Sequence, residues 1–329
     1  MTTNQNRKNL IDEMAYAIES DVTLSDKDKA TVLRNLAGLK ETKVNILVTG
    51  ATGCGKSSTI NALFNTDKAQ VGQGVDPQTM DIQKYELNNV VLFDSPGLGD
   101  GKEADLRHAK NITDKLYEKG PDGNSLIDLV LVILDGSSRD LGTSFELINN
   151  VVIPALGKDT GRLLVAINQA DVAMKGKNWD HVKNCPEPTL VKFLDDKVAS
   201  TRKRIKETTG VDIEPIYFSA GYKDGDASQN PYNLSKLLAF ILRHTKQEKR
   251  AVFAQDMNQD KKVWKDDDKQ SDYREEIKQS MWESVKSTAG KGASLGGALG
   301  AVLGPKGAAV GAAIGTVLGA AWGALTSWW

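Results

Sequence analysis

The stretch VNILVTGATGCGKSSTINALF, residues 44–64, decides the fold of this chain. Its middle part, Gly50 to Ser57, matches the pattern GxxxxGK[ST], with a short apolar run before it and a helical pattern after it. Glycines in such a turn let successive main-chain N–H groups point at phosphate oxygens, and the helix that follows adds the positive end of its dipole. The stretch therefore predicts a strand, a phosphate-binding loop and a helix.

We expect the whole loop to bind the phosphates of a nucleotide. Lys56 would bridge the β- and γ-phosphates during catalysis, and Ser57 would offer its hydroxyl to Mg²⁺. A reactive thiol at Cys54 is conceivable, but a passive small side chain is the preferred interpretation. The predicted nucleotide-binding residues in this part of the chain are Gly50, Ala51, Thr52, Gly53, Cys54, Gly55, Lys56, Ser57 and Ser58.

Outward from this stretch, strand and helix patterns alternate. Short apolar runs rich in β-branched residues are typical of parallel strands that are buried on both faces. They lie at 44–49, 90–94, 129–135, 163–168 and 214–219. The run 81–87 alternates instead and predicts an antiparallel edge strand in a hairpin. Together these patterns predict an α/β fold, a Ras-like three-layer sandwich with a mostly parallel six-stranded sheet.

Asp94-Ser-Pro-Gly97 ends the second apolar run. A carboxylate at Asp94 can hold a magnesium-bound water, and the N–H of Gly97 can donate to the γ-phosphate and so sense its presence. Thr79, between the first helix and the edge strand, is our candidate for a mobile loop that closes over Mg²⁺ and the γ-phosphate. A plain surface threonine is the alternative.

The base is expected to be read by Asn168-Gln169-Ala170-Asp171, which ends the run 163–168. The Asp171 carboxylate can accept hydrogen bonds from N1–H and the N2 amino group of guanine, which adenine lacks. Asn168 would tie this loop to the phosphate-binding loop and meet the edge of the base. In Ser219-Ala220, the N–H of Ala220 could donate to guanine O6.

The order GATGCGKSSTINALF, Thr79, DSPGLGD, NQAD and SAG resembles GTPases of the Era-like and septin-like branches. It is most similar to small bacterial GTPases of prophages and genomic islands. The resemblance covers about residues 43–245. It implies Mg²⁺-dependent GTP hydrolysis and a switch role, with GTP or GDP as the bound nucleotide.

Two positions depart from that pattern. Gln169 stands where these GTPases usually have lysine, and this predicts somewhat weaker nucleotide affinity. Leu98 stands where Ras-type enzymes have a glutamine that positions water, so the intrinsic machinery looks incomplete. Septin-like relatives dimerise across their nucleotides, and some use an arginine near position 139. We therefore expect Arg139 to reach the partner's phosphates in a GTP-bound homodimer. An arginine bonded to its own loop is the alternative, and Arg107 is a weaker candidate.

The remaining segments predict four parts of the chain. Residues 1–42 read as an N-terminal helical hairpin, either packed on the next domain or serving as a partner-binding arm. The GTPase domain would span 43–245. Residues 246–288 are highly charged and read as a solvated helix or linker. Residues 289–329 repeat glycine every four positions and read as a glycine-zipper hydrophobic helical hairpin.

The last 23 residues, Gly307 to Trp329, carry no charge and as a helix would measure roughly 35 Å, against about 30 Å of membrane hydrocarbon. Glycine and alanine add little hydrophobicity, so insertion would be marginal. The hairpin would either associate with membrane lipid in one nucleotide state or pack within the soluble protein or an oligomer.

Net charge is −1, from 42 basic and 43 acidic residues, so no nucleic-acid partner is expected. Two cysteines, with no secretory signal, predict a cytoplasmic protein with conditional inner-membrane association. The expected function is a GTP-hydrolysing switch coupled to the C-terminal hairpin. The alternatives are a slow-hydrolysing GTP-bound scaffold and a nucleotide-gated membrane-disrupting effector.

Overall fold

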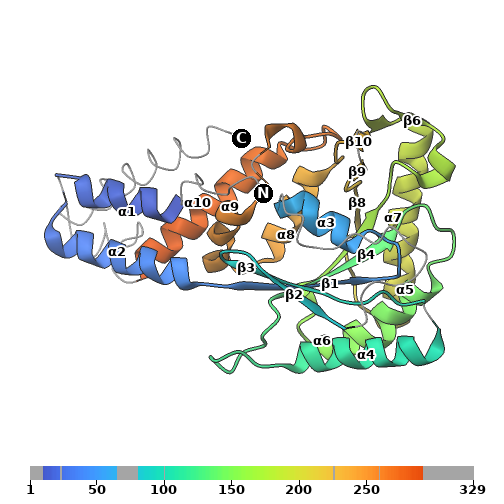
Figure 1. Ribbon diagram of the computed structural model, residues 1–329, viewed down its shortest axis with the longest axis horizontal. Coiled ribbons are helices and arrows are strands. Elements are labelled where there is room, and N and C mark those ends of the chain that lie inside the picture. Colours follow the sequence, from blue (N-terminus) through green and yellow to red (C-terminus); the bar gives the residue numbers. More distant parts are fainter. Residues whose placement is uncertain are drawn as a thin grey trace.

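The computed structural model describes residues 10–22, 24–64, 81–99, 101–224, 227–258 and 260–291. In it, a sheet with helices on both faces adjoins a group of helices that lies at one end of the strands (Figure 1). Thr79 and residues 292–329, which are all but the first three residues of the predicted glycine-zipper hairpin, lie outside these ranges. The predictions made for them therefore stay predictions.

The central sheet has six strands in the order β2-β3-β1-β4-β5-β8. All neighbours pair in parallel except β2 and β3, which form an antiparallel hairpin. This confirms the predicted sheet, including its antiparallel edge strand. The strands are β1 (Val44–Gly50), β2 (Gln83–Glu86), β3 (Val90–Asp94), β4 (Leu129–Asp135), β5 (Leu163–Asn168) and β8 (Ile216–Tyr217).

Apolar residues on both faces of the strands build two separate cores. Along β4, Leu129, Leu131 and Ile133 enter one core. The alternate residues Val130 and Val132 enter the other. Successive side chains of a strand point to opposite faces, so a continuous apolar run supplies both cores at once.

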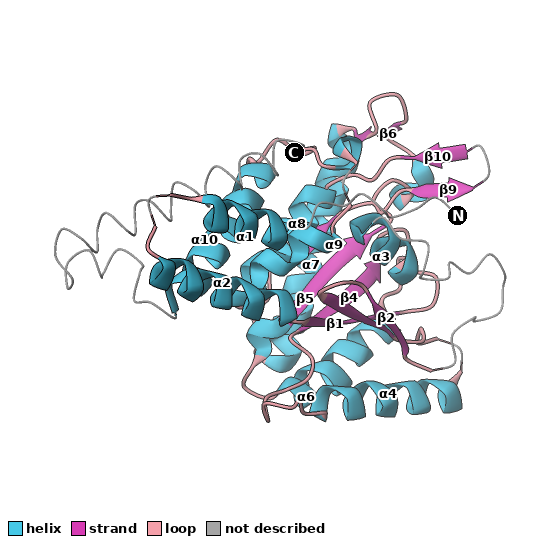
Figure 2. Ribbon diagram, turned by 60° about the vertical axis from the view of Figure 1, so that its left-hand side comes forward, coloured by secondary structure: helices cyan, strands magenta, loops and turns pink. Residues whose placement is uncertain are grey.

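Helices cover each face of the sheet, as the three-layer prediction requires (Figure 2). Helices α3 (Lys56–Phe64) and α8 (Leu234–His244) contribute Ile60, Leu63 and Leu237 to one core. Helices α4 (Lys102–Tyr117) and α7 (Pro188–Thr209) contribute Ile112 and Leu190 to the other. The short helices α5 (Gly142–Glu146), η1 (Leu147–Val152) and α6 (Ile153–Leu156) follow β4.

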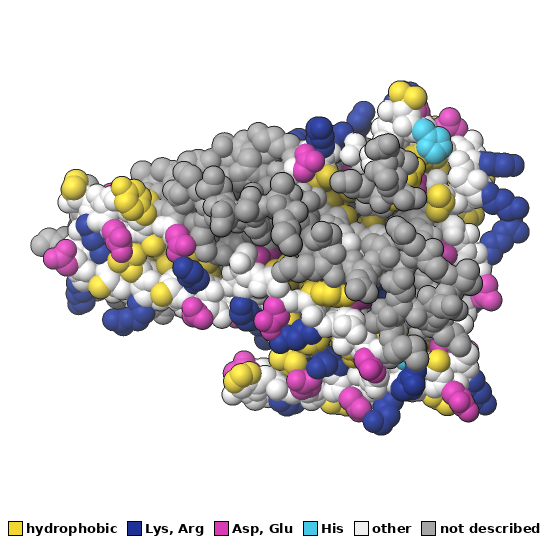
Figure 3. Space-filling view, in the orientation of Figure 1, with side chains coloured by type: hydrophobic (Ala, Val, Ile, Leu, Met, Phe, Trp, Pro, Cys, Tyr) yellow, Lys and Arg dark blue, Asp and Glu magenta, His cyan; other side chains and the backbone are white. Residues whose placement is uncertain are grey.

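The group of helices at the end of the sheet contains helices from the beginning and from the end of the described chain, which pack on one another. Helix α1 packs on α2, and α10 packs on α2, α8 and η4. On the face drawn in Figure 3, basic, acidic and apolar side chains are interspersed over α1 and α2. The elements are α1 (Leu10–Ser20), α2 (Asp26–Glu41), η4 (Gln247–Val252), α9 (Phe253–Asp256) and α10 (Tyr273–Lys291).

The expectation that residues 246–288 are a solvated helix or linker is wrong. Phe253 and Trp264 are fully buried, and Ile277 and Met281 of α10 enter the same core as α3 and α8. Tyr273, Ile277 and Met281 recur every four residues, which places them on one side of the helix. That apolar stripe is narrow, and the many surrounding charges hide it in the composition.

A buried carboxylate attaches these helices to the sheet. Asp256, at the end of α9, accepts hydrogen bonds from the main-chain N–H groups of Asn88, Asn89 and Val90 at 2.9, 2.7 and 2.8 Å. It also accepts one from the Asn88 side chain at 2.7 Å. Asn89 in turn donates to the carbonyl oxygens of Lys40 and Thr42 at the end of α2. The turn between β2 and β3 is thus held from two helices.

Two small two-stranded sheets were not predicted from the sequence. They are β6 (Trp179–Asp180) with β7 (Cys185–Pro186), and β9 (Tyr222–Asp224) with β10 (Ala227–Gln229). Among the helices that the structure describes, none has the length and apolarity to cross a membrane.

Candidate functional site

The phosphate-binding loop connects β1 to α3 at the carboxyl end of the parallel strands. Gly55 has a φ of +89°, and a Cβ added there would lie 2.2 Å from Nδ2 of Asn168. Glycine at this position allows the backbone conformation of the loop. It also leaves room for the base-reading loop, residues 168–171, to lie against the phosphate-binding loop. Nζ of Lys56 lies 3.3 and 3.1 Å from the carbonyl oxygens of Gly50 and Ala51, curled over the loop. Ser58 follows in the first turn of α3.

The two predicted Mg²⁺-binding residues that the structure describes meet each other. Oγ of Ser57 donates to Oδ2 of Asp94 at 2.9 Å. Asp94 is buried, and within the described part of the chain its other oxygen, Oδ1, has no hydrogen-bond partner. Burial raises the pKa of the Asp94 carboxyl, while Lys56 and Ser57 act in the opposite direction. A hydroxyl and a carboxylate with one unpartnered buried oxygen fit the oxygen ligands that Mg²⁺ prefers.

The segment after Asp94 lies directly against the phosphate-binding loop. The main-chain N–H of Thr52 donates to the carbonyl oxygen of Leu98 at 3.0 Å, and Leu98 N–H donates to that of Gly50 at 3.4 Å. A Cβ added at Gly97 would lie 2.5 Å from the Thr52 nitrogen, so a larger residue would collide with main chain. Leu98 is buried in this contact and brings no polar group to it.

Asn168 connects three loops of the site. Its side-chain amide donates to the carbonyl oxygen of Cys54 at 3.0 Å, which confirms the predicted tie to the phosphate-binding loop. Its side-chain oxygen accepts the N–H of Ala220 at 2.9 Å. The Ala220 N–H that we assigned to guanine O6 is thus engaged with Asn168, so O6 would have to share or displace that bond. Ser219 supports the same turn, because its hydroxyl accepts the N–H of Gly221 at 3.2 Å.

Gln169 and Asp171 lie at the start of the predicted base pocket. Gln169 adopts a left-handed backbone with φ of 61°. From there its side-chain amide donates to the carbonyl oxygen of Gly53 at 2.7 Å. Gln169 therefore provides a second hydrogen bond between the base-reading loop and the phosphate-binding loop, in addition to the bond from Asn168 to Cys54. Asp171 is 8% exposed, as expected for a carboxylate that faces a bound base.

The loop that carries Arg139 follows β4 and borders the base loop. Gly136 N–H donates to the carbonyl oxygen of Asn168 at 2.8 Å. Lys197, from α7, donates to the carbonyl oxygens of Gly136 and Ser138 at 2.7 and 2.6 Å, and burial lowers the pKa of its amine. Arg139 itself is exposed, and its side chain makes no hydrogen bond or ion pair with any part of the chain that the structure covers. The alternative in which Arg139 is bonded to its own loop is absent from this conformation.

Sequence reasoning missed several residues that organise the site. Asp135 accepts the N–H and the hydroxyl of Ser137, each at 2.7 Å. It ends a buried apolar strand as Asp94 does, and that position was the available signal. Lys197 gave no signal, because its contact depends on how α7 packs. Burial raises the pKa of the Cys54 thiol to about 11, so the passive interpretation of this residue is supported.

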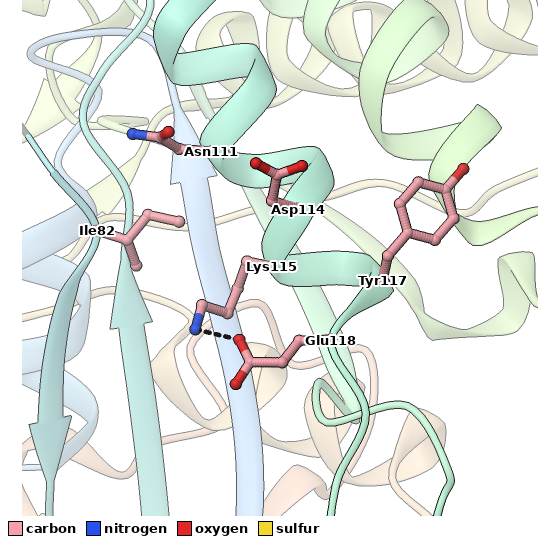
Figure 4. Close-up of a pocket in the computed structure, with 6 residues that line it drawn as sticks. All are labelled: Ile82, Asn111, Asp114, Lys115, Tyr117 and Glu118. Carbon is pink, nitrogen blue, oxygen red and sulfur yellow. Dashed lines mark hydrogen bonds and ion pairs between the residues drawn. The ribbon is translucent and has the colours of Figure 1, made fainter.

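A separate pocket of about 490 Å³ lies between α4 and the residue that precedes β2. Figure 4 shows Ile82 facing the side chains of α4 across it, with Lys115 paired to Glu118 at 2.5 Å. None of the predicted site residues lines this pocket. It therefore gives no further support to the nucleotide site.

Part of the chain that forms this site is similar to known proteins. A family model described as "50S ribosome-binding GTPase" matches residues 45–169. No curated protein matches the chain significantly. Solved structures that are similar to part of this chain include Toc33 from Arabidopsis thaliana with Mg²⁺ and GMPPNP, at 16% identity and a TM-score of 0.41, covering 66% of this chain and 85% of that one. Era from Aquifex aeolicus, bound to GDP and AlF4⁻, has 17% identity and a TM-score of 0.41, covering 65% and 68%.

The matched residues contain the phosphate-binding loop, Asp94 to Gly97 and the start of the base loop at Asn168. These are the parts that the structure brings together around one site. Residues 45–169 are therefore similar to the domain that this GTPase family shares.

Proposed function

We propose that this protein is a Mg²⁺-dependent GTP-hydrolysing switch that is activated by dimerisation and controls its C-terminal glycine-repeat segment. The observation that carries the proposal is the contact of Ser57 with Asp94 beside Lys56, with the buried Oδ1 of Asp94 left unpartnered among the described residues. A magnesium-bound water that donates to this oxygen would satisfy it, and the phosphates would occupy the loop between β1 and α3.

Ser57 and Asp94 would hold Mg²⁺, the Asp94 carboxylate through a water, and Thr79 would complete the set. The metal would neutralise charge that develops on the phosphate oxygens. The chain's own groups would do the rest: the loop amides and Lys56 would grip the triphosphate, and Asp171 would select guanine. Such a site works by positioning and electrostatic stabilisation, because phosphoryl transfer needs little covalent chemistry from the protein.

Dimerisation would supply a positive charge for the transition state at a site whose intrinsic machinery, with Leu98 in place of a water-positioning glutamine, is incomplete. Arg139 is exposed, has no partner in the described chain, and stands on a loop that is bonded to the base loop. An arginine supplied by a second molecule can contribute roughly 10³–10⁵ in rate. The two-point hold of Lys197 on that loop supports a fixed presentation of Arg139 to a partner.

The output would pass along β3 to the helices at the far end of the sheet. Asp94 ends this strand, and Val90 begins it with its N–H bound to Asp256. Asp256 ends α9, which leads to α10, and α10 packs on α2, α8 and η4 and then leads to the glycine-repeat segment. A nucleotide-dependent shift of β3 would therefore be transmitted to the base of that segment.

We place the protein in the cytoplasm, with the glycine-repeat segment associating with the inner membrane in one nucleotide state. The support is sequence-based: an uncharged run of 23 residues with glycine every four positions. Liposome flotation of the full-length protein, with GMPPNP or with GDP, tests this against a 1–291 truncation that keeps all of α10. Identical flotation of the two proteins in both nucleotide states would reject it.

The nucleotide assignment has its own test. Purified protein should retain GTP and GDP in preference to ATP when Mg²⁺ is present, and should bind them more weakly after chelation. Equal or better retention of ATP would overturn the guanine assignment. A second candidate, a ribosome-associated GTPase, is favoured by the description of the matched family, and it bears against our expectation of no nucleic-acid partner. Cosedimentation with ribosomal subunits, with GMPPNP and with GDP, distinguishes it.

A further inference from the structure

We propose that His108, assisted by Asp105, is a positioning residue. It holds the loop that contains Gly97, between β3 and α4, in place for the γ-phosphate of GTP. His108 lies on α4, the helix that follows this loop. No part of the expected nucleotide chemistry assigns it a role. The inference rests on the GTPase function and deepens it, because it names the groups that set the γ-phosphate sensor.

Two side chains of α4 reach back to the loop from the same side of the helix. Asp105 and His108 are three residues apart, and residues at this spacing are neighbours on a helix surface. Oδ1 of Asp105 accepts the N–H of Gly99 at 2.8 Å. Nδ1 of His108 lies 3.0 Å from the carbonyl oxygen of Gly97. The helix thus holds the loop at alternate residues, with Leu98 between them.

The proton in the His108 bond can be assigned from chemistry. A carbonyl oxygen only accepts, so Nδ1 of His108 is the donor to Gly97. The side chain is 1% exposed, and its other nitrogen, Nε2, is buried without a partner among the residues that the structure describes. Burying an unpartnered nitrogen is unfavourable, and an apolar side chain could fill the same space without that cost. A histidine here is explained if the bond from Nδ1 is the feature that matters.

The loop is held from the opposite side by the phosphate-binding loop. Thr52 N–H donates to the carbonyl oxygen of Leu98 at 3.0 Å, and a Cβ at Gly97 would collide with Thr52. The peptide group between Gly97 and Leu98 has its C=O bound to His108 and its N–H directed to the carbonyl oxygen of Gly50 at 3.4 Å. His108 therefore fixes the orientation of a peptide that lies between α4 and the phosphate-binding loop.

Position 98 is a leucine, which makes the main-chain groups held by His108 more important for the nucleotide. With no polar side chain at position 98, the main chain is what the loop can offer to the reacting end of GTP. The Gly97 N–H is expected to meet the γ-phosphate, which GDP lacks. His108 holds the Gly97–Leu98 peptide, which directly follows this N–H in the main chain. Loss of its bond should therefore affect binding and hydrolysis of the triphosphate and leave GDP binding alone.

The test compares His108→Ala, His108→Asn and His108→Gln in the full-length chain with Mg²⁺. The Asn side-chain amide falls near the position of Nδ1 and can replace the donor, whereas the Gln amide falls near Nε2 and cannot. We measure Kd for GMPPNP and for GDP, the single-turnover rate of GTP hydrolysis, and thermal unfolding. His244→Ala is the matched control, because His244 makes a similar bond to the Phe240 carbonyl within α8.

We expect His108→Ala and His108→Gln to weaken GMPPNP binding about 2- to 10-fold relative to GDP, which is the usual contribution of one hydrogen bond. His108→Asn should restore most of that ratio and of the hydrolysis rate, and His244→Ala should change neither. Equal losses for GMPPNP and GDP, or rescue by Gln as good as by Asn, would overturn the inference. Wild-type protein that binds neither nucleotide would instead overturn the GTPase site itself.

Discussion

The side-chain amide of Gln169 donates to the carbonyl oxygen of Gly53 at 2.7 Å, and so links the base-reading loop to the phosphate-binding loop. A lysine is usual at this position in the GTPases that the sequence resembles. The glutamine makes the contact between the loops without a charge. The remaining difference is the length of the stem that can cover the base.

Substitutions at Gln169 should therefore change nucleotide affinity in a graded order. Gln169→Ala removes the bond to Gly53 and should weaken GDP binding about 2- to 10-fold. Gln169→Lys keeps a donor, adds a longer stem over the base, and should bind more tightly than wild type. Calorimetry with GDP and Mg²⁺ measures both. A lysine variant with no gain in affinity would contradict the prediction of a weakened site.

Arg139→Ala should abolish the dependence of GTP hydrolysis on protein concentration. Because Arg139 is exposed and unpaired in the described chain, its removal should leave GDP affinity and the free energy of unfolding nearly unchanged. The measurement is phosphate release at several protein concentrations. Arg107→Ala is the comparison, since Arg107 is the other candidate arginine. An Arg139 variant that keeps wild-type hydrolysis at high concentration would refute the role in trans.

Asp256→Ala should strongly destabilise the protein. The change leaves the buried N–H groups of Asn89 and Val90 without an acceptor and loses two bonds to Asn88. We expect the free energy of unfolding to fall by roughly 3 kcal/mol or more in urea denaturation. Asp260→Ala, which removes one exposed bond to Lys262, is the control and should cost less than about 1 kcal/mol. A loss as small as the control's would mean that this joint contributes little.

Asp267 should make stability depend on pH in the acid range. Burial raises its pKa from 3.8 to about 6, so the folded protein binds the proton more tightly than the unfolded chain. The stabilisation is complete below pH 3.8 and is lost as pH rises through 6, and it amounts to about 3 kcal/mol. Asp267→Asn keeps an acceptor for the Asn233 N–H and should be more stable than wild type at pH 7.5.

Urea denaturation of wild type and Asp267→Asn at pH 4.5 and 7.5 isolates this group, because other titrations cancel in the difference. The advantage of the variant should shrink at the lower pH. An advantage that is the same at both pH values, or a variant less stable at pH 7.5, would show that Asp267 is not the titrating group.

The parts that the sequence predicted are those whose signal is local. The apolar runs 90–94 and 163–168 had to be buried strands, and Asp94 and Asn168 followed because they end those strands. The order of residues in the phosphate-binding loop carried the site in the same way. The tie from Asn168 to Cys54 was predictable because both loops follow parallel strands at the same carboxyl end of one sheet.

The parts that it could not predict depend on contacts between distant segments. His108 lies in an ordinary amphipathic helix, and only the fold shows that its ring meets Gly97. Asp256 is one acid in a charged region, yet it is buried against a turn far away in the sequence. The stripe of Tyr273, Ile277 and Met281 was visible, but a narrow stripe on a charged helix is equally compatible with exposure.

The burial of Cys54 in the phosphate-binding loop makes selective fluorescent labelling of the protein possible. Burial raises the pKa of the Cys54 thiol to about 11, so the reactive thiolate is scarce at pH 7, and the side chain is shielded from solvent. Cys185 in β7 is the remaining free thiol and is partly accessible. A maleimide dye should therefore attach at Cys185 alone in the native chain, with no cysteine to remove. Asn184, the residue before it, donates to the Asn230 carbonyl, so the dye would lie near the turn at Ser219 and Ala220.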